Sequence, residues 1–322
     1  MGVAPGGLAE TPLHLSVAPS TLIPPARAGG ALSTASRFDT FLKNIKVTGD
    51  HRSAALTSVN AIARKLQGHY SNAPYTDAWR MVIGSYGKGT AVRPPRDVDV
   101  LFFMPVHEYD RYTRYTRNGQ SALLQDIRRL LLQRYPRTEI GGDGQVVVVD
   151  FATGHKVEVL PGWHRRGGGM IVPNTHDGGS WQHVDHNAEI AFVADSDAKT
   201  NGNTRNLIQM MKVWQTYCSV PIKSLVLELR SVEFLKGWEH AQSSTDYYDW
   251  MVRDFFAELI KKANSWHTIP GTSEKKQYGD AWLSKAQSAH GRAVKACEYE
   301  LAGKQLSAAT EWRKIFGSQY EF

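Results

Sequence analysis

Two aspartates, at positions 97 and 99, open a short apolar segment and follow a glycine–serine turn in the chain. Because side chains on a β-strand alternate between its two faces, Asp97 and Asp99 should point the same way, while Val98 and Val100 face a core. Two carboxylates on one face of a rigid strand suit Mg²⁺, which prefers hard oxygen ligands. The pattern therefore predicts a magnesium site on this strand.

The preceding turn, which starts at Gly84 and Ser85, lies between two strand-like segments, residues 79–83 and 97–104. Glycine lets backbone N–H groups approach anionic oxygens closely, and the hydroxyls of Ser85 and Thr90 add hydrogen-bond donors. We therefore expect phosphate oxygens to bind beside the metal, with Lys88 as a further nucleotide-binding candidate in the same loop.

A polar stripe is expected on a helix over residues 206–217, opposite its apolar face. Arg205, Gln209 and Lys212 recur at helical spacing along this stripe. Two cations on one helix face could both reach a triphosphate. A second helix is expected to begin near Ser224.

These segments carry a family resemblance. The Gly-Ser turn followed by Asp-x-Asp resembles the signature of the polymerase-β-type nucleotidyltransferases. The stretches Lys212-Val213-Trp214, Lys223-Ser224 and Glu228-Leu229 are similar to a region of the cGAS/DncV-like nucleotidyltransferases, or CD-NTases. The segment from Trp312 to Gly317 resembles the close of the bacterial members. The resemblance runs from about residue 37 to residue 322.

The resemblance implies a third carboxylate on a neighbouring strand. Glu158, followed by two apolar residues and Pro161, is similar to the family pattern, although family members commonly carry Asp there. Asp150, at the end of four valines, is the alternative, and its position is also typical of a strand-end turn. In the family the residues equivalent to Lys212 and Ser224 contact the donor triphosphate.

The fold that the resemblance implies is α+β. It has a polymerase-β-like nucleotidyltransferase core with a mixed β-sheet, a helical second lobe, and an active site in the cleft between them. We expect a low-complexity, poorly ordered arm over residues 1–36, the core over 37–200, and a helical lobe over 201–322. The histidines between residues 155 and 186 are expected to lie in a solvated loop, and residues 164–169 are expected to form a flexible connector.

The activity that the resemblance implies is the joining of NTPs into a cyclic di- or trinucleotide, with release of pyrophosphate. Asp97, Asp99 and Glu158 would hold two Mg²⁺ ions, for which Mn²⁺ may substitute. The expected partners are NTP substrates, a separate effector protein reached through the diffusible product in antiphage signalling, and an activating protein or nucleic acid.

Composition is compatible with this interpretation. The chain has 322 residues, with 38 basic and 31 acidic side chains giving a charge of +7, which favours anionic partners such as nucleotides. Its two cysteines, Cys218 and Cys297, offer neither a disulfide framework nor a Cys-rich zinc site. Without a membrane-length apolar run or a leader pattern, we expect a cytoplasmic enzyme with no membrane partner.

Three alternatives remain open at this point. An RNA-terminal nucleotidyltransferase, of the CCA-adding or poly(A) type, would use the same acids. A transferase that modifies a small molecule or a protein would also use them, but such enzymes are typically shorter. A nucleotide-binding scaffold without catalysis is the third, and the departure to Glu158 keeps it open.

Overall fold

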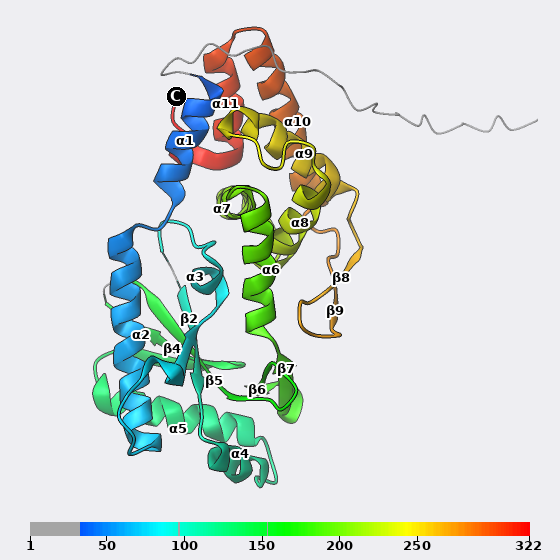
Figure 1. Cartoon of the computed structure of the whole chain (residues 1–322). Helices are drawn as coiled ribbons and strands as arrows, with labels where there is room; N and C mark the ends of the chain where they lie inside the picture. Colours follow the sequence, from blue (N-terminus) through cyan, green and yellow to red (C-terminus); the bar gives the residue numbers. More distant parts are fainter. Residues whose placement is uncertain (1–32, 96, 153) are drawn as a thin grey trace, which may run out of the picture.

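The computed structural model describes residues 33–95, 97–152 and 154–322, and most of the arm expected over residues 1–36 lies outside these ranges. The described chain forms two lobes, one built on a β-sheet and one built of helices (Figure 1). The strands of the first lobe are β1 Arg80–Val82, β2 Asp97–Phe103, β3 Glu139–Asp143, β4 Val146–Asp150, β5 Lys156–His164, β6 Met170–Asn174 and β7 Ser180–Val184. Its helices are α2 Gly49–Tyr70, α3 Gly84–Lys88, α4 Val106–Thr113 and α5 Gly119–Arg134.

The sheet is mixed, as expected from the sequence. Its strand order is β1-β2-β5-β4-β3, and β6 and β7 continue from β5. Strands β2 and β5 run parallel, whereas the other pairs are antiparallel. A parallel pair requires a long crossover connection, and here the chain from β2 to β5 passes through α4, α5, β3 and β4.

Helices α2 and α5 cover one face of the sheet. Alternating residues of the central strands, Val98, Val100, Val157 and Val159, face these helices and are at most 1% exposed. The alternation that the sequence predicts for residues 97–100 is therefore present. It leaves the acidic side chains of the same strands on the opposite face.

The second lobe contains the helices α6 His186–Lys199, α7 Asn203–Tyr217, α8 Ser224–Gly237, α9 Tyr248–Ile260, α10 Leu283–Leu301 and α11 Gln305–Phe316. The 3₁₀ helices of the described chain are η1 Asp77–Trp79, η2 His176–Gly178, η3 Thr245–Tyr247 and η4 Gly317–Gln319. Among the described residues, no helix combines the length and the apolar character that a membrane span requires.

Helix α1, Thr34–Ile45, packs in the helical lobe although it precedes the sheet in the chain (Figure 1). Its Phe38 and Phe41 are fully buried among residues of α7, α9 and α11. The first helix of the stretch expected as the core, residues 37–200, thus buries its apolar side chains in the cluster of the helical lobe. Amphipathicity shows that a helix buries one face, but it does not show which lobe covers that face.

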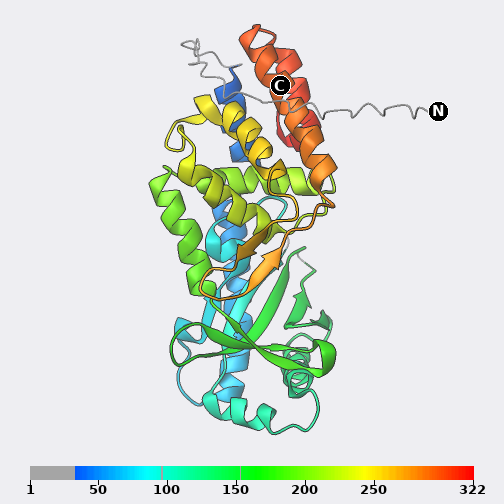
Figure 2. The ribbon, with the colours of Figure 1, turned by 90° about the vertical axis from the view of Figure 1, so that its right-hand side faces the viewer.

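Two hairpins differ from the sequence expectation. Residues 266–277 form the antiparallel pair β8 Trp266–Thr268 and β9 Lys275–Gln277, where only helix was expected. The hairpin reaches from the helical lobe toward the sheet (Figure 2), and a Cβ at its tip residue Gly271 would lie 2.5 Å from Cβ of Ala188 in α6. The stretch expected as a flexible connector instead forms a tight turn between β5 and β6, closed by the Arg165 N–H to Gly169 carbonyl bond of 3.1 Å.

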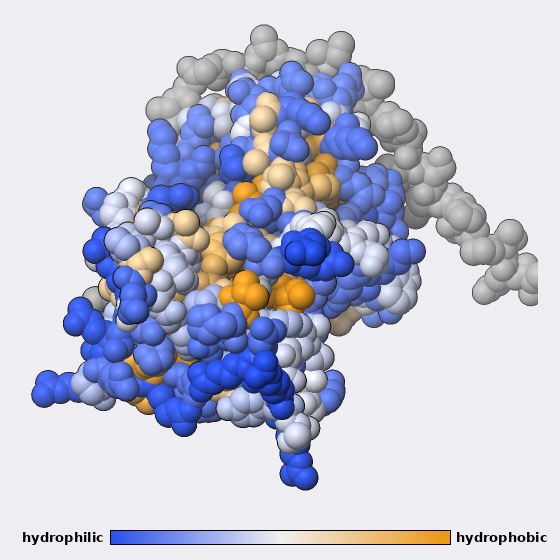
Figure 3. All heavy atoms as spheres, turned by 60° about the horizontal axis from the view of Figure 1, so that its bottom comes forward, coloured by the Kyte–Doolittle hydropathy of each residue, from blue (hydrophilic) through white to orange (hydrophobic). Residues whose placement is uncertain are grey.

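The surface at the sheet-lobe end is mostly hydrophilic, and hydrophobic side chains gather near its centre (Figure 3).

On the sheet face opposite α2 and α5, a second and smaller hydrophobic cluster is buried. It consists of Ile83, Leu101, Leu160, Met170 and Val172. Leu101 of this cluster follows Asp99 by two residues on β2, so both side chains are on the same face of the sheet. That face is therefore polar at one end of β2 and apolar at the other.

Candidate active site

Parallel pairing of β2 with β5 places the candidate acids side by side. In this register Asp99 lies opposite Glu158, and Asp97 lies opposite Lys156. Cross-strand partners project from the same face of a sheet, so Asp99 and Glu158 are neighbours on the face away from α2 and α5. The structure thus places all three carboxylates predicted to hold the metal in the lining of one cleft.

The electrostatics of this group favour a cation. Burial raises the pKa of Glu158 to about 7, with further contributions from the charges of Asp99 and Asp97 and from a hydrogen bond with Asp99. The pKa of Asp99 is also raised, by burial and by Asp97. Carboxylates that repel one another are stabilised by a positive ion. Within the described residues, however, no three such side chains already converge on one point, and the metal site stays a prediction.

The glycine–serine turn is in direct contact with this group. It forms the short helix α3 rather than an open loop, and Gly84 begins it with φ of +57°. A Cβ on Gly84 would lie 1.8 Å from Oδ2 of Asp99, so only glycine lets the backbone come this close to the carboxylate. The Ile83 N–H also donates to the backbone carbonyl of Asp99 at 2.9 Å.

A cleft of about 1020 Å³ opens above these residues and is lined by both lobes. Its lining includes these predicted site residues: Gly84, Ser85, Lys88, Asp97, Asp99, Glu158, Lys212 and Ser224. Thr90 is the one predicted site residue outside this lining, and it is fully buried. In this arrangement Thr90 has no surface to offer a nucleotide.

Asp150, the alternative third acid, is placed differently. It lies opposite Lys156 at the end of β4, and its Oδ2 is 2.9 Å from Nζ of that lysine. The described lining of the cleft includes Glu158 but not Asp150. Geometry therefore favours Glu158 for the third position.

The cations of the polar stripe on α7 separate. Lys212 lines the cleft, whereas the described lining does not include Arg205. Arg205 instead bonds through Nε to the carbonyl of Lys88 at 2.8 Å and through Nη1 to Asp197 at 2.6 Å. The expectation that both cations of the stripe reach a triphosphate is not met in this structure, because Arg205 holds the end of α3 instead.

Lys88 and Lys212 share the carboxylate of Glu228 on α8, at 2.8 and 2.7 Å. Lys88 also pairs with Glu189 of α6 at 2.8 Å, and Lys212 donates to Oγ1 of Thr90 at 2.9 Å. In the sequence, Glu228 stands out only through the family resemblance, and Glu189 belongs to no motif. Local sequence spacing could not have predicted the two contacts of Lys88, because Glu189 and Glu228 are 101 and 140 residues away from it in the sequence.

Ser224 and Tyr217 line the cleft on the side of the helical lobe. Oγ of Ser224 donates to Oε1 of Gln215 at 2.9 Å near the start of α8. Tyr217, at the end of α7, is 55% exposed and lines the cleft. Its ring packs on Gly317, where a Cβ would lie 2.7 Å from Cδ2 of the tyrosine. The sequence indicated the helix that ends at Tyr217 and the segment from Trp312 to Gly317 as separate features, but it did not indicate that the two are in contact.

Known proteins resemble this chain in sequence and in fold. A family model described as the Second Messenger Oligonucleotide or Dinucleotide Synthetase domain matches residues 32–196. A relative described as a probable cyclic nucleotide synthase, from Bacillus cereus (strain VD146), is 22% identical over 331 residues, which cover 88% of this chain and 97% of the relative.

Solved structures with a similar fold include three bacterial proteins. CdnC of E. coli MS115-1, in complex with HORMA-deltaN, has a TM-score of 0.71 at 16% identity, covering 89% of this chain and 98% of its own. The Vibrio cholerae DncV cyclic AMP-GMP synthase, with a linear intermediate, has a TM-score of 0.70 at 13% identity, with 90% and 96% covered. Bradyrhizobium diazoefficiens CdnG with GTP has a TM-score of 0.60 at 13% identity, with 89% and 96% covered. The predicted nucleotidyltransferase fold is confirmed.

Proposed function

Because the chain belongs to the second messenger oligonucleotide or dinucleotide synthetase family, as its resemblance to the CD-NTases predicted, we propose that it joins NTPs into a cyclic di- or trinucleotide with release of pyrophosphate. The observation that carries the proposal is the register that sets Asp99 beside Glu158, with Gly84 against the Asp99 carboxylate. Acids for a metal and a turn for phosphates then meet at one place in the cleft.

The donor set fits a hard divalent cation. Asp97, Asp99 and Glu158 would hold Mg²⁺, or Mn²⁺ in its place, and two such ions would neutralise phosphate charge and acidify the acceptor hydroxyl. The proposal includes Glu158 as the third ligand or as the base that takes the hydroxyl proton. The raised pKa of Glu158 supports the role of base, because it makes this carboxyl a better proton acceptor than an ordinary glutamate, and the repulsion from Asp99 and Asp97 supports the role of ligand.

Phosphoryl transfer leaves a protein mainly with positioning and charge neutralisation. In our proposal Ser85, Lys88, Lys212 and Ser224 hold the β- and γ-phosphates, with backbone N–H groups at Gly84. The acceptor ribose hydroxyl then attacks the α-phosphorus, and pyrophosphate leaves. Tyr217, with an exposed ring in the cleft, is placed to stack on a base.

Ring closure needs room for two nucleotides. The cleft volume of about 1020 Å³ is at the upper end of the usual range for a single small ligand. We propose that a linear intermediate turns in this space and that its own 5′-triphosphate is then attacked by its terminal hydroxyl. The DncV structure with a linear intermediate supports this order of events for a similar fold.

The wider role belongs to the same proposal. The product would act in the cytoplasm as a second messenger that switches on a separate effector in antiphage signalling. The similar CdnC structure contains HORMA-deltaN, which supports a protein activator for this chain as well. The charge of +7 supports a nucleic-acid activator as the alternative.

The deciding experiment incubates the purified chain with all four NTPs and Mg²⁺ or Mn²⁺, followed by phosphatase treatment and mass spectrometry. We expect a phosphatase-resistant compound whose mass is that of nucleoside monophosphates less one water for each. Asp99→Asn serves as the inactive control. Products that require added RNA, or that phosphatase trims, would support the RNA-terminal alternative. NTP binding without pyrophosphate release, with the protein partner present, would support the scaffold.

A further inference from the structure

A buried ionic network joins the two lobes directly behind the cleft, and Glu228 is its centre. The residue is 4% exposed. Its Oε1 accepts hydrogen bonds from Nζ of Lys212 at 2.7 Å and from Oγ1 of Thr90 at 3.2 Å. Its Oε2 accepts from Nζ of Lys88 at 2.8 Å. One carboxylate thus holds both lysines that face the cleft.

The network is balanced in charge without a ligand. The two lysines are matched by Glu228 and by Glu189, which is 2.8 Å from Lys88. An ammonium group has three N–H donors. Lys212 uses two of them, on Thr90 and Glu228, and Lys88 uses two, on Glu189 and Glu228. Within the described residues, one donor on each lysine is left for another acceptor.

Burial makes these positions rigid. A lysine on a surface is a flexible point charge, and fixing it on binding costs side-chain entropy. Lys88 and Lys212 are only 5% and 7% exposed and are each held by a carboxylate that is itself buried. Burial alone would raise the pKa of Glu228, but Lys212 and Lys88 lower it, so the carboxylate stays charged. The entropy of placing both ammonium groups has therefore been lost before a nucleotide arrives.

The same carboxylate also reaches the glycine–serine turn. Lys88 is the last residue of α3, and Gly84, the first, touches the Asp99 carboxylate. Lys88 and Gly84 are therefore the two ends of one helix of only 5 residues. Glu228 thereby links the helical lobe to both the phosphate-binding turn and the acids.

We infer that Glu228 is a positioning residue for the donor triphosphate: it touches no nucleotide but orients Lys88 and Lys212 so that their remaining N–H donors meet phosphate oxygens. This inference rests on the proposed function, since it takes an NTP as the ligand of the cleft. It assigns a role in donor binding to a side chain that carries the wrong charge for direct contact with phosphate.

The test is a double-mutant cycle between Glu228→Gln and Lys212→Met. Pyrophosphate release gives kcat and KM, and the Mg²⁺ complex of α,β-methylene-ATP gives a Kd. Each single variant should raise KM and Kd about tenfold or more, the range expected when a charge-assisted hydrogen bond to phosphate is lost. In the Lys212→Met background, Glu228→Gln should add less than it does alone, because one of the two lysines that it orients is gone and only Lys88 remains.

Two further variants separate positioning from folding. Glu228→Asp keeps the charge but draws the carboxylate back by one methylene, so we expect a folded protein with a raised KM. Glu233→Gln is the matched control, because Glu233 lies on the same helix, pairs with Arg230 and is outside the cleft lining. Its KM should be that of the wild type.

The outcomes are distinct. If the wild type releases no pyrophosphate with its activator present, the proposed function fails. If the wild type is active and folded Glu228 variants keep its KM and Kd, the inference is wrong. Equal effects of Glu228→Gln in the wild-type background and in the Lys212→Met background would also overturn it, because they would indicate a purely structural role.

Discussion

Glu158 and Asp150 lie on neighbouring strands, but their surroundings differ. Glu158 is opposite Asp99 and its pKa is raised to about 7, chiefly by burial. The carboxylate of Asp150 forms an ion pair with Lys156 at a partly exposed strand end, with Oδ2 2.9 Å from Nζ of the lysine. A charge that is repelled by its neighbours gains most from a metal ion, whereas one that is already paired gains little.

We therefore predict that Glu158→Gln removes most of the activity, by about 10²-fold or more, as for loss of a group that handles a proton or a metal. Donor binding should be retained. Asp150→Asn, the matched control, should be tolerated. Pyrophosphate release and binding of α,β-methylene-ATP measure the two effects. The reverse pattern would move the third carboxylate to Asp150.

Glu189 allows a prediction about pH. Burial alone would raise its pKa, but the hydrogen bond with His186 and the charge of Lys88 lower it to about 2 from the ordinary 4.5. A carboxyl whose pKa is lower in the folded chain stabilises the fold above its unfolded pKa, and this contribution is lost as the pH falls through the folded pKa. Glu189→Gln should therefore lower the free energy of unfolding at pH 7, by on the order of 3 kcal/mol.

The difference between Glu189→Gln and wild type should shrink as the pH falls below about 4.5 toward 2. Urea unfolding at pH 7, 5 and 3 measures it. Glu258→Gln removes a carboxylate that pairs with Lys261 on the surface, and it should change stability by less than about 1 kcal/mol. A destabilisation by Glu189→Gln that stays constant over this pH range would contradict the lowered pKa of Glu189.

At the scale of elements, α3 depends on one glycine. Gly84→Ala would push a methyl group into Oδ2 of Asp99, 1.8 Å away, at a φ of +57° that an L-residue adopts at a cost of about 1–2 kcal/mol. We predict that kcat falls at least tenfold. The control is Gly68→Ala, inside α2, where a Cβ meets nothing within 4 Å and should stabilise the helix by up to about 1 kcal/mol. Wild-type turnover in Gly84→Ala would show that Asp99 can move freely.

The elements that the sequence predicted well are those with a strong local period. Strand alternation placed Val98 and Val100 in the core and the acids on the other face, and the helix expected over residues 206–217 is present as α7. The hairpin of residues 266–277 was missed because its strands are only three residues long and its residues are mostly exposed. Short exposed strands carry no apolar alternation.

The partners within the site were less predictable. The motifs indicated Lys88, Thr90 and Lys212 as single contacts to a nucleotide, whereas the structure joins them through Glu228. This grouping depends on how α3, α7 and α8 pack together, and packing across lobes has no signature in local spacing. The contacts of Arg205 with Lys88 and Asp197 depend on packing in the same way.

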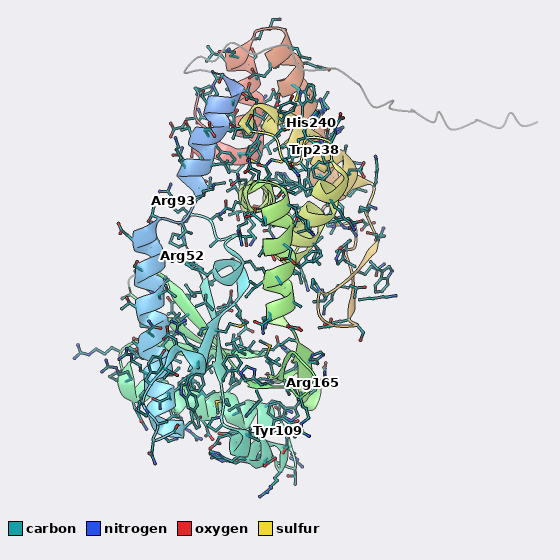
Figure 4. The ribbon with its side chains drawn as sticks, viewed as in Figure 1. Arg52, Arg93, Tyr109, Arg165, Trp238 and His240 are labelled. Atoms are coloured by element: carbon teal, nitrogen blue, oxygen red, sulfur yellow. The ribbon has the colours of Figure 1, made fainter. Side chains whose placement is uncertain are left out.

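At the scale of the whole molecule, the two ends of the described chain meet. Phe38 of α1 packs against Trp312 with ring centroids 5.3 Å apart, and against Tyr320 at 5.2 Å. Arg93 lies near the joint between α1 and α2 (Figure 4). The N–H of Arg93 donates to the carbonyl of Ile45 at 2.7 Å, and Gln319 contacts the Arg93 carbonyl at 3.5 Å. The chain ends thus support the approach to the acids.

The last prediction tests whether these ends act as one unit. Phe38→Leu and Trp312→Phe each replace a fully buried aromatic side chain with a smaller one, and each should lower the free energy of unfolding by about 1–2 kcal/mol. Because the two rings touch, the double variant should deviate from the sum by about 0.5 kcal/mol or more. Phe102→Leu is the control, since Phe102 is 1% exposed but lies in the cluster beneath the sheet, and it should add independently to Trp312→Phe. Urea unfolding of the two cycles gives both coupling energies. Additivity between positions 38 and 312, or equal coupling in the control cycle, would show that the junction is not a cooperative unit of its own.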